Sequence, residues 1–309
     1  MKLTKMFFAF AIVAVMFASC KSEEEVTGIT LDESSLSVAV NDTAMLTATL
    51  LPKGATGDVT WASSNTTVAT VMDGEVIGVK EGTANIIASV GSFTATCVVT
   101  VTKEVIDFNV ALTGTEYFPI VLDGVTSVKL GTKIKADFRP DESTKFLYIW
   151  DNTFVAGTST GPNFFGEVEG WVSLSVGTVG WSGAGFNCKD ASLIDKLAPI
   201  TANPDKYYLH IGIKSRSAAT FVIGMDGQSN TKFAIGPAAF NDNGTLIQPL
   251  ANFTRDGEWQ QIEIPMSTLK TNGLLYSTGM GEKNILWLLA GGVAGTDLNL
   301  DAVFIYKKQ

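Results

Sequence analysis

The sequence offers few side chains that could carry out a reaction, and the most obvious is its single histidine. His210 lies in KYYLHIGIKS, where it alternates with Leu209 and Ile211 as residues of a β-strand do. A serine or cysteine triad would have to be built on His210, yet no GxSxG, HExxH or clustered Cys/His pattern accompanies it. We therefore expect His210 on the less apolar face of its strand, at the surface or against a ligand, and not in catalysis.

A pair of carboxylates is the other reactive combination. Glu167 and Glu169 in FFGEVEGW would lie on one side of a strand, about 6.5 Å apart, near the carboxyl separation that glycosidases use. Catalytic pairs generally come from different strands, however, and neighbouring glutamates usually mark a solvated face. The pattern keeps a glycoside hydrolase as a weaker alternative to a non-catalytic protein.

Aromatic side chains gather between residues 150 and 189, among glycine and asparagine residues that are typical of loops. Sugar recognition needs flat aromatic faces beside polar groups that bond hydroxyls. The predicted stacking residues are Trp150, Trp181, Phe165 and Trp171, and the predicted hydrogen-bonding residues are Asn152, Asn163 and Glu167. In contrast, Trp259 and Trp287 lie in continuous apolar segments, so we expect both in the core.

The N-terminal residues have the layout of a secretory signal peptide, predicted here for residues 1–19. Lys2 and Lys5 precede an uncharged apolar run that is too short to span a bilayer comfortably. The segment that ends in Cys20, FASC, resembles a bacterial lipobox, and this resemblance implies that Cys20 is the lipidated first residue of the mature protein. The alternative is an ordinary signal peptide in which the cysteine has no role.

Residues 20–25 continue this segment with the lipidated cysteine and an acidic linker. KSEEE is expected to be solvated. It resembles the surface-export signal of lipoproteins from Gram-negative glycan-degrading bacteria. The resemblance implies an outer-membrane protein, held by its lipid anchor, that faces the extracellular side; a plain linker would leave it facing the periplasm.

Composition indicates the fold class and excludes one class of partner. The formal net charge is −9, so nucleic acid is not an expected partner. Only 17% of the residues are charged, and 30 are glycine. Short alternating strands separated by turns recur throughout, and they predict an all-β protein: an N-terminal Ig-like β-sandwich followed by a larger two-sheet β-sandwich, which the resemblance described below makes a jelly-roll-type β-sandwich.

Residues 26–102 carry the more specific of two family resemblances. The segments LSV, LTA, LLP, VTWASSN, VATV, GEVIGV and GTA follow one another with the spacing of the bacterial Ig-like domain (group 2). That family occurs in adhesins and as a spacer in surface enzymes and binding proteins. The resemblance implies a structural unit with no catalytic residues.

Residues 103–309 form a second, larger β-rich unit. The segment GEWQQIEIPM and the closing strand LNLDAVFI loosely resemble the galactose-binding-like jelly roll of many carbohydrate-binding modules. The resemblance makes Asp301, just before the closing apolar run, a candidate ligand for structural calcium; no other cofactor is expected. Whether residues 103–170 belong to this sandwich or form a separate small unit stays open.

Taken together, the lipobox, acidic linker, Ig-like spacer and terminal sandwich resemble the surface glycan-binding lipoproteins of starch-utilisation-like systems. This resemblance implies a non-catalytic protein that captures polysaccharide or oligosaccharide for degradation and import, beside a glycan transporter complex. A neutral β-glucan is the expected ligand because no basic cluster marks an acidic one. A cell-surface adhesin that binds a protein partner is the alternative.

Overall fold

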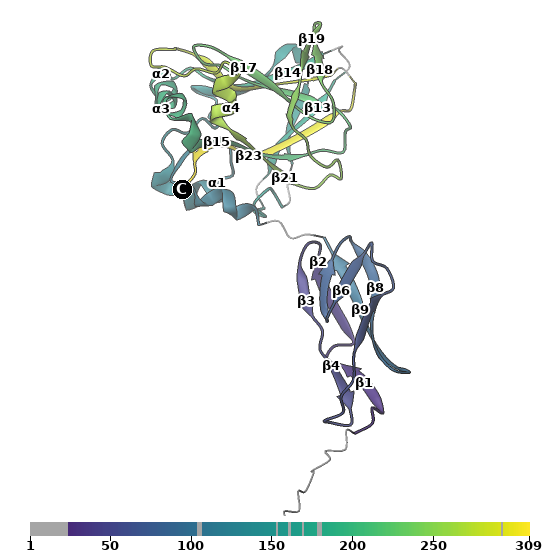
Figure 1. The fold of residues 1–309 in the computed structure, drawn as a ribbon. Coiled ribbons are helices and arrows are strands. Elements are labelled where there is room, and N and C mark those ends of the chain that lie inside the picture. The colour runs from purple at the N-terminus through teal and green to yellow at the C-terminus, as the bar shows by residue number, and fades with distance from the viewer. Residues whose placement is uncertain are drawn as a thin grey trace, which may run out of the picture. The chain divides into compact units, whose positions relative to one another are not determined.

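The chain divides into two units, Met1–Ile106 and Asp107–Gln309. The computed structural model describes residues 24–103, 107–152, 154–159, 162–168, 170–177, 181–291 and 293–309. Strands dominate both units, so the predicted all-β fold class is confirmed (Figure 1). No helix in these ranges is both long and apolar enough to cross a membrane.

The N-terminal unit is an Ig-like β-sandwich. A four-stranded sheet in the order β2-β9-β8-β5 and a three-stranded sheet in the order β3-β7-β6 enclose its core, and β1 pairs with β4. The strands are β1 (Gly28–Leu31), β2 (Ser35–Ala39), β3 (Thr43–Met45), β4 (Ala48–Leu51), β5 (Thr60–Ser63), β6 (Ala69–Met72), β7 (Glu75–Gly78), β8 (Gly82–Val90) and β9 (Phe93–Thr102). Alternate residues of β8 and β9, such as Ile86 and Val99, are buried, which is the period expected of strands with one inward face.

The second unit consists of two six-stranded sheets and a short hairpin. The β23 sheet contains β12 (Phe154–Ser159), β13 (Trp171–Val176), β23 (Asp297–Lys307), β15 (Tyr207–Lys214) and β21 (Gln260–Pro265) in that order, with β10 (Glu116–Val121) also paired to β23. The β14 sheet contains, in order, β11 (Lys145–Ile149), β14 (Trp181–Cys188), β22 (Lys283–Gly291), β16 (Phe221–Met225), β17 (Thr231–Ile235) and β20 (Pro249–Ala251). The hairpin is β18 (Phe240–Asp242) and β19 (Thr245–Ile247).

The core of the second unit lies between its two sheets. Leu209, Ile211 and Ile213 of β15 and Leu286 and Leu288 of β22 belong to one buried cluster. Because side chains alternate along a strand, the residues between them face outward from the sandwich. Strands β10 and β11 belong to these sheets, so the open question about residues 103–170 is answered: their described strands are part of the sandwich.

Short helical segments connect the strands: η1 (Phe108–Thr113), α1 (Gly124–Leu130), η2 (Gly131–Lys133), η3 (Trp150–Asn152), α2 (Ala191–Ile194), η4 (Asp195–Leu197), α3 (Ala198–Ala202), η5 (Pro204–Lys206) and α4 (Met266–Thr271). The sequence does not predict α1. Its signal is the capping residue Asp123, whose Oδ1 accepts a hydrogen bond of 2.7 Å from the Thr126 amide.

Two strands lie end to end along one edge of β23. Strand β13 pairs with residues 297–300 of β23, and β10 pairs with residues 303–307. Between them the register of β23 against β15 shifts, and Ala302 adopts a left-handed φ of 49°. This is a β-bulge, which adds a residue to one strand and redirects its side chains. The sheet therefore has a gap between β10 and β13, beside Asp301.

Candidate functional site

A line of directly paired residues crosses the outer face of the β14 sheet. Tyr148 of β11 pairs with Gly185, Gly185 with Trp287, Trp287 with Gly224, and Gly224 with Lys232 of β17. We call these five residues the cross-strand row. It spans five strands, or about 19 Å at the usual strand spacing of about 4.8 Å. Its larger side chains therefore alternate with glycines along a line perpendicular to the strands.

The glycines let two indoles lie directly on the sheet. A Cβ atom built on Gly224 would overlap Cε2 and Cζ2 of Trp287, and one built on Gly183 would overlap Cε3 of Trp150. Trp150 also passes 3.6 Å from the Cβ position of Gly185. The ring centroid of Trp150 is 6.3 Å from that of Tyr148 and 6.3 Å from that of Trp287. One side of each indole thus rests on the backbone, and the opposite side is turned away from the sheet.

Polar groups fix the central indole and extend beside it. Nε1 of Trp287 donates a hydrogen bond of 2.9 Å to Oδ1 of Asp226. Nδ2 of Asn284 donates to the other oxygen of Asp226 at 3.2 Å, and Nδ2 of Asn187 donates to Oδ1 of Asn284 at 3.4 Å. Carboxylate and amide groups therefore accompany the aromatic surface.

A hollow lies at each end of the cross-strand row. One, of about 390 Å³, is lined by Tyr148 and Asn187 together with charged residues of neighbouring segments. The other, of about 280 Å³, is lined by Asn230, Thr231, Lys232 and Trp287. The row and its hollows form an extended surface with apolar rings along the middle and polar groups at the sides.

A separate aromatic cluster lies on the outer face of the β23 sheet. The ring centroids of Trp171 and Trp259 are 5.5 Å apart, and Nζ of Lys214 lies 3.7 Å and 4.5 Å from them, respectively. Nε1 of Trp171 donates to Oδ1 of Asn299 at 2.9 Å. Burial lowers the pKa of Lys214 below its usual range. The ammonium group already covers these indoles, so they offer a ligand less open surface than the cross-strand row.

The core positions predicted for Trp259 and Trp287 are wrong. Both indoles are only partly buried, and they lie on outer faces of the two sheets. In β22 the inward positions are filled by Leu286 and Leu288, so Trp287 must point outward. A strand that is apolar on both faces hides this alternation from sequence analysis.

Three residues that were predicted to contact a ligand belong to the loop of residues 162–168, where their side chains bond to or pack against the protein: Asn163, Phe165 and Glu167. Asn163 is only 2% exposed, and its Oδ1 accepts hydrogen bonds of 3.0 Å from the amides of Phe165 and Glu167. Phe165 packs edge-on against buried Phe164, at 5.0 Å between centroids. Glu167 forms an ion pair of 2.6 Å with Lys129. The structure does not place Asn163 where a surface ligand can reach it, because its side chain holds the loop together.

The predicted site residues therefore do not form one site. Trp150 lies on the β14 sheet, whereas Trp171 and the loop of residues 162–168 lie on the β23 sheet. The backbone of Trp181 begins β14 and pairs with Gly291, but its side chain and that of Asn152 lie outside the described part. Cys20 and Glu169 also lie outside the described residues.

The surface position predicted for His210 is wrong, because the loop and β23 cover it. His210 is 0% exposed, its ring stacks on Phe304 with centroids 4.7 Å apart, and Phe164 packs edge-on at 5.2 Å. The Ala302 carbonyl accepts a hydrogen bond of 2.7 Å from Nδ1, which therefore carries the proton. Burial lowers the pKa of His210 from its usual 6.5. The ring is therefore neutral and buried beneath the loop, on the outer face of the β23 sheet.

We expect this buried histidine to make stability depend on pH. The folded pKa is depressed, so below about pH 6.5 the unfolded chain takes up a proton that the folded chain does not, and stability falls. Thermal melts should show a lower Tm near pH 5.5 than near pH 7.5, a range in which histidine is the main titrating side chain. An NMR signal of the single histidine that titrates near its usual pKa in the folded protein would contradict this account.

Asp301, the candidate calcium ligand, has its side chain bonded to the protein backbone. Asp301 is 1% exposed, and its Oδ2 accepts a hydrogen bond of 3.0 Å from the Phe164 amide. Within the described ranges, no three or more His, Cys, Asp or Glu side chains are grouped to hold a metal ion. Asp301 thus fastens the loop of residues 162–168 to the β23 sheet.

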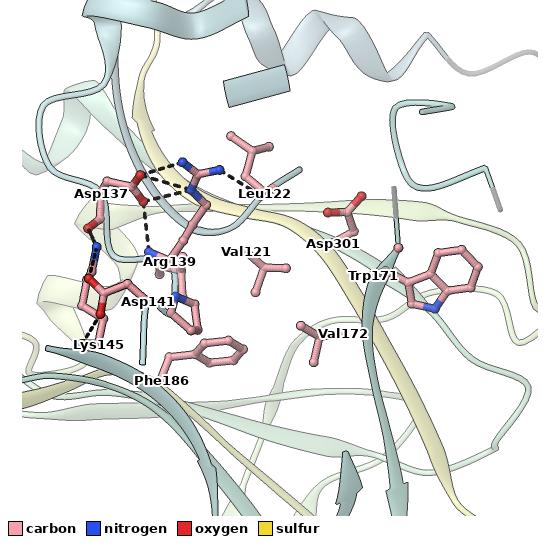
Figure 2. A pocket seen from close by; sticks show the side chains of 13 residues that line it. Val121, Leu122, Asp137, Arg139, Asp141, Lys145, Trp171, Val172, Phe186 and Asp301 are labelled. Carbon is pink, nitrogen blue, oxygen red and sulfur yellow. Dashed lines mark hydrogen bonds and ion pairs between the residues drawn. The ribbon is translucent and has the colours of Figure 1, made fainter. Parts of the chain in front are cut away.

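A third feature is a hollow of about 390 Å³ at the gap between β10 and β13, which we call the gap pocket (Figure 2). The end of β10, the start of β13 and Asp301 frame it, and Phe186 of β14 lies at its base. Its lining residues are Ile120, Val121, Leu122, Asp137, Arg139, Pro140, Asp141, Lys145, Gly170, Trp171, Val172, Phe186 and Asp301.

Sequence analysis missed the cross-strand row, although one signal for it exists. Glycines inside a strand weaken it and mark places where another group approaches closely. Gly183 and Gly185 alternate in WSGAGF, and Gly224 interrupts the apolar segment FVIGM. These positions indicate a close approach on one face, but they do not identify the side chain that makes it.

Comparisons with known proteins give one family match. Residues 25–101 match the model of the bacterial Ig-like domain (group 2). A comparison with curated proteins found no match. Similar solved structures include an exo-β-agarase, at 10% identity and a TM-score of 0.34, over 53% of this chain and 24% of that chain. The chain thus spans about a quarter of that enzyme's length.

Two carbohydrate-binding modules are also among the similar structures. A family 30 module aligns at 16% identity and a TM-score of 0.31, over 52% of this chain and 87% of that chain. A family 11 module from Clostridium thermocellum, in complex with a β-1,3-1,4-mixed-linked tetrasaccharide, aligns at 10% identity and a TM-score of 0.31, over 54% of this chain and 90% of that chain. At such TM-scores the similarity carries no conclusion about a ligand.

Proposed function

We propose that this protein is a non-catalytic, cell-surface glycan-binding lipoprotein and that its second unit binds a linear saccharide along the cross-strand row. The observation that carries this proposal is that the indoles of Trp150 and Trp287 lie directly on glycines of the β14 sheet. A pyranose presents a C–H face to such a ring and hydroxyl groups to polar neighbours. Asp226, Asn187 and Asn284 supply acceptors and donors beside the rings.

The charges around the row favour a neutral glycan. Lys232 forms an ion pair of 2.6 Å with Asp242, and Nζ of Lys189 lies 4.9 Å from the ring centroid of Phe146. Glu142 and Glu282 line the hollow beside Tyr148. This mixed set would repel a polyanion at some positions, while hydroxyl groups can bond to either sign of charge.

A non-catalytic role fits the state of the reactive groups. Glu167, half of the carboxylate pair that a glycosidase would need, is bound to Lys129. His210 is buried and neutral. We propose that the protein captures polysaccharide and passes it to a glycan transporter complex, with the Ig-like unit as a spacer.

Affinity electrophoresis of the full mature chain tests this function. Gels that contain neutral polysaccharides, β-glucans among them, should slow its migration, whereas gels with acidic polysaccharides should not. Retardation by no polysaccharide would refute the proposal, and specific binding to a host or bacterial protein instead would support the adhesin alternative.

We propose that lipidated Cys20 anchors the protein to the outer membrane, where the acidic linker that follows it, with Glu23, Glu24 and Glu25, directs it to the extracellular side. Cys20→Ala should release the chain from membranes and abolish its labelling with a fatty-acid probe, because several acyl chains provide most of the membrane affinity. Replacing Glu23, Glu24 and Glu25 is the matched control: lipidation should persist while accessibility to external protease falls. Continued labelling of Cys20→Ala would disprove the anchor.

A further inference from the structure

We infer that the gap pocket is a second saccharide site, which takes a terminal sugar residue and not an internal one. The inference takes its class of ligand from the proposed function. The pocket itself shares no residue with the cross-strand row, so the two sites can be tested separately.

The gap pocket is a fixed opening of the sheet. Hydrogen-bonded pairing to β23 holds β13 on one side of the gap and β10 on the other. The bulge at Ala302 separates the two paired stretches, and β15 continues on the far side of β23. Backbone pairing therefore sets the part of the frame that the β23 sheet supplies, and residues 137–141, between η2 and β11, add the charged side of the pocket.

Two ion pairs form one wall of the pocket, which Figure 2 shows on the side away from Trp171. Arg139 donates to the Asp137 carboxylate from Nε at 3.0 Å and from Nη2 at 2.7 Å, and its Nη1 bonds to the Leu122 carbonyl at 3.3 Å. Nζ of Lys145 lies 3.0 Å from the Asp137 carbonyl oxygen and 3.2 Å from Oδ2 of Asp141. The cationic groups of Arg139 and Lys145 and the carboxylates of Asp137 and Asp141 therefore line this side of the pocket in positions fixed by their hydrogen bonds.

The two carboxylates of this wall, Asp137 and Asp141, are held in their charged form. Burial acts to raise the pKa of Asp137, but the hydrogen bonds from Arg139 hold it below its usual value. Backbone amides of Thr144 and Ser143 lower the pKa of Asp141. A wall that presents carboxylates and cations side by side suits a neutral ligand with hydroxyl groups, because a simple anion or cation would meet a like charge.

The base of the pocket is apolar. Val121, Val172 and Phe186 line it, with Val121 and Val172 between the charged wall and Trp171 (Figure 2). A hollow beside core residues leaves them without packing partners on one side, and a ligand of suitable shape restores those contacts. A pyranose has this combination: carbon-bound hydrogens on its faces and hydroxyl groups around its edge.

The pocket is closed by the opposite sheet, and this favours a chain end. Phe186 belongs to β14, so a ligand that enters through the β23 sheet meets the second sheet and cannot pass beyond it. An internal residue of a linear glycan has a neighbour on each side and needs an open groove. A terminal residue, or a free monosaccharide of the same chemistry, needs only one exit.

NMR of the ¹⁵N-labelled full mature chain tests the pocket. The probes are glucose, galactose, mannose and xylose at millimolar concentrations, and the signals are the Nε–H of Arg139 and the Nε1–H of Trp171. At least one sugar should shift both signals in a saturable way. Arg139→Gln and Lys145→Gln should each abolish the Trp171 shift, whereas Lys133→Gln, at an exposed position outside the pocket, should retain it.

The outcomes separate the pocket from the row. No shift with any of the four sugars, or an undiminished shift in both folded pocket variants, overturns the inference. A shift that persists in Trp287→Ala supports an independent site, and a protein that shows the shift but retains no polysaccharide would refute only the proposed role of the row. An oligosaccharide that binds at least about tenfold more tightly than its monosaccharide identifies the ligand as a chain end, and equal affinity identifies a free sugar.

Discussion

Replacing Trp287 by alanine is expected to weaken polysaccharide binding by about 2 kcal/mol or more, roughly 30-fold. Trp287 is the middle member of the cross-strand row and pairs with glycines on both neighbouring strands. Its removal would take away the central stacking surface and leave Asp226 without its indole donor. Calorimetry with an oligosaccharide of the bound glycan, together with thermal melts, measures affinity and folding separately. Trp150→Ala should act in the same direction.

Two variants serve as controls for this result. Trp287→Phe keeps an aromatic face but loses the hydrogen bond to Asp226, so it should retain part of the affinity. Trp259→Ala removes the comparable indole on the β23 sheet and should leave polysaccharide binding unchanged. If Trp259→Ala abolishes binding while folded Trp287→Ala binds normally, the glycan lies on the β23 sheet and the proposed site is wrong.

Gly224→Ala is expected to weaken binding about as strongly as loss of the indole, although it adds only one methyl group. The new Cβ would overlap Cε2 and Cζ2 of Trp287, so the indole must move away from its contact with β16. Inserting a methyl group into a closely packed contact costs about 1–3 kcal/mol of stability. Denaturant melts measure the stability, and affinity electrophoresis measures the binding.

A double-mutant cycle isolates the cause of that effect. When Trp287→Ala is already present, the indole that Gly224→Ala would displace is gone. The stability cost of Gly224→Ala should then shrink to a small value, and the two changes should be strongly non-additive. An equal cost in both backgrounds would show that Gly224 is needed for the strand itself and not for the seating of Trp287.

The fold of the N-terminal unit was predictable because the sequence pattern of each strand lies within a few consecutive residues. Each strand of the Ig-like sandwich is short, alternates in polarity, and ends at a turn, so the pattern can be followed along the sequence. Short helices at residues 191–199 and 266–272 could be predicted for the same reason: α2 and η4 lie in the first stretch, where α3 also begins, and α4 lies in the second. Local patterns also indicated that the second unit is a sandwich of strands.

The site was less predictable because it depends on which residues become neighbours across strands. Tyr148, Gly185 and Trp287 are far apart in the sequence, and only the register of β11, β14 and β22 brings them into line. Trp171 and Trp150 looked alike in sequence, as aromatics among small residues, yet they lie on different sheets. His210 alternated as a surface residue would, but a distant loop carrying Phe164 covers it.

The strand-interior glycines beneath the indoles also bear on how such a protein can change over evolutionary time. A glycine in a strand costs about 0.5–1 kcal/mol relative to alanine, so Gly183, Gly185 and Gly224 are poor choices for the sheet alone. They are useful only while indoles rest on them. A descendant released from selection for this surface could gain stability by losing the indoles and filling these positions. Replacements at Gly183 and Gly224 would then close the route back, because the new Cβ at either position would exclude an indole that reappeared later.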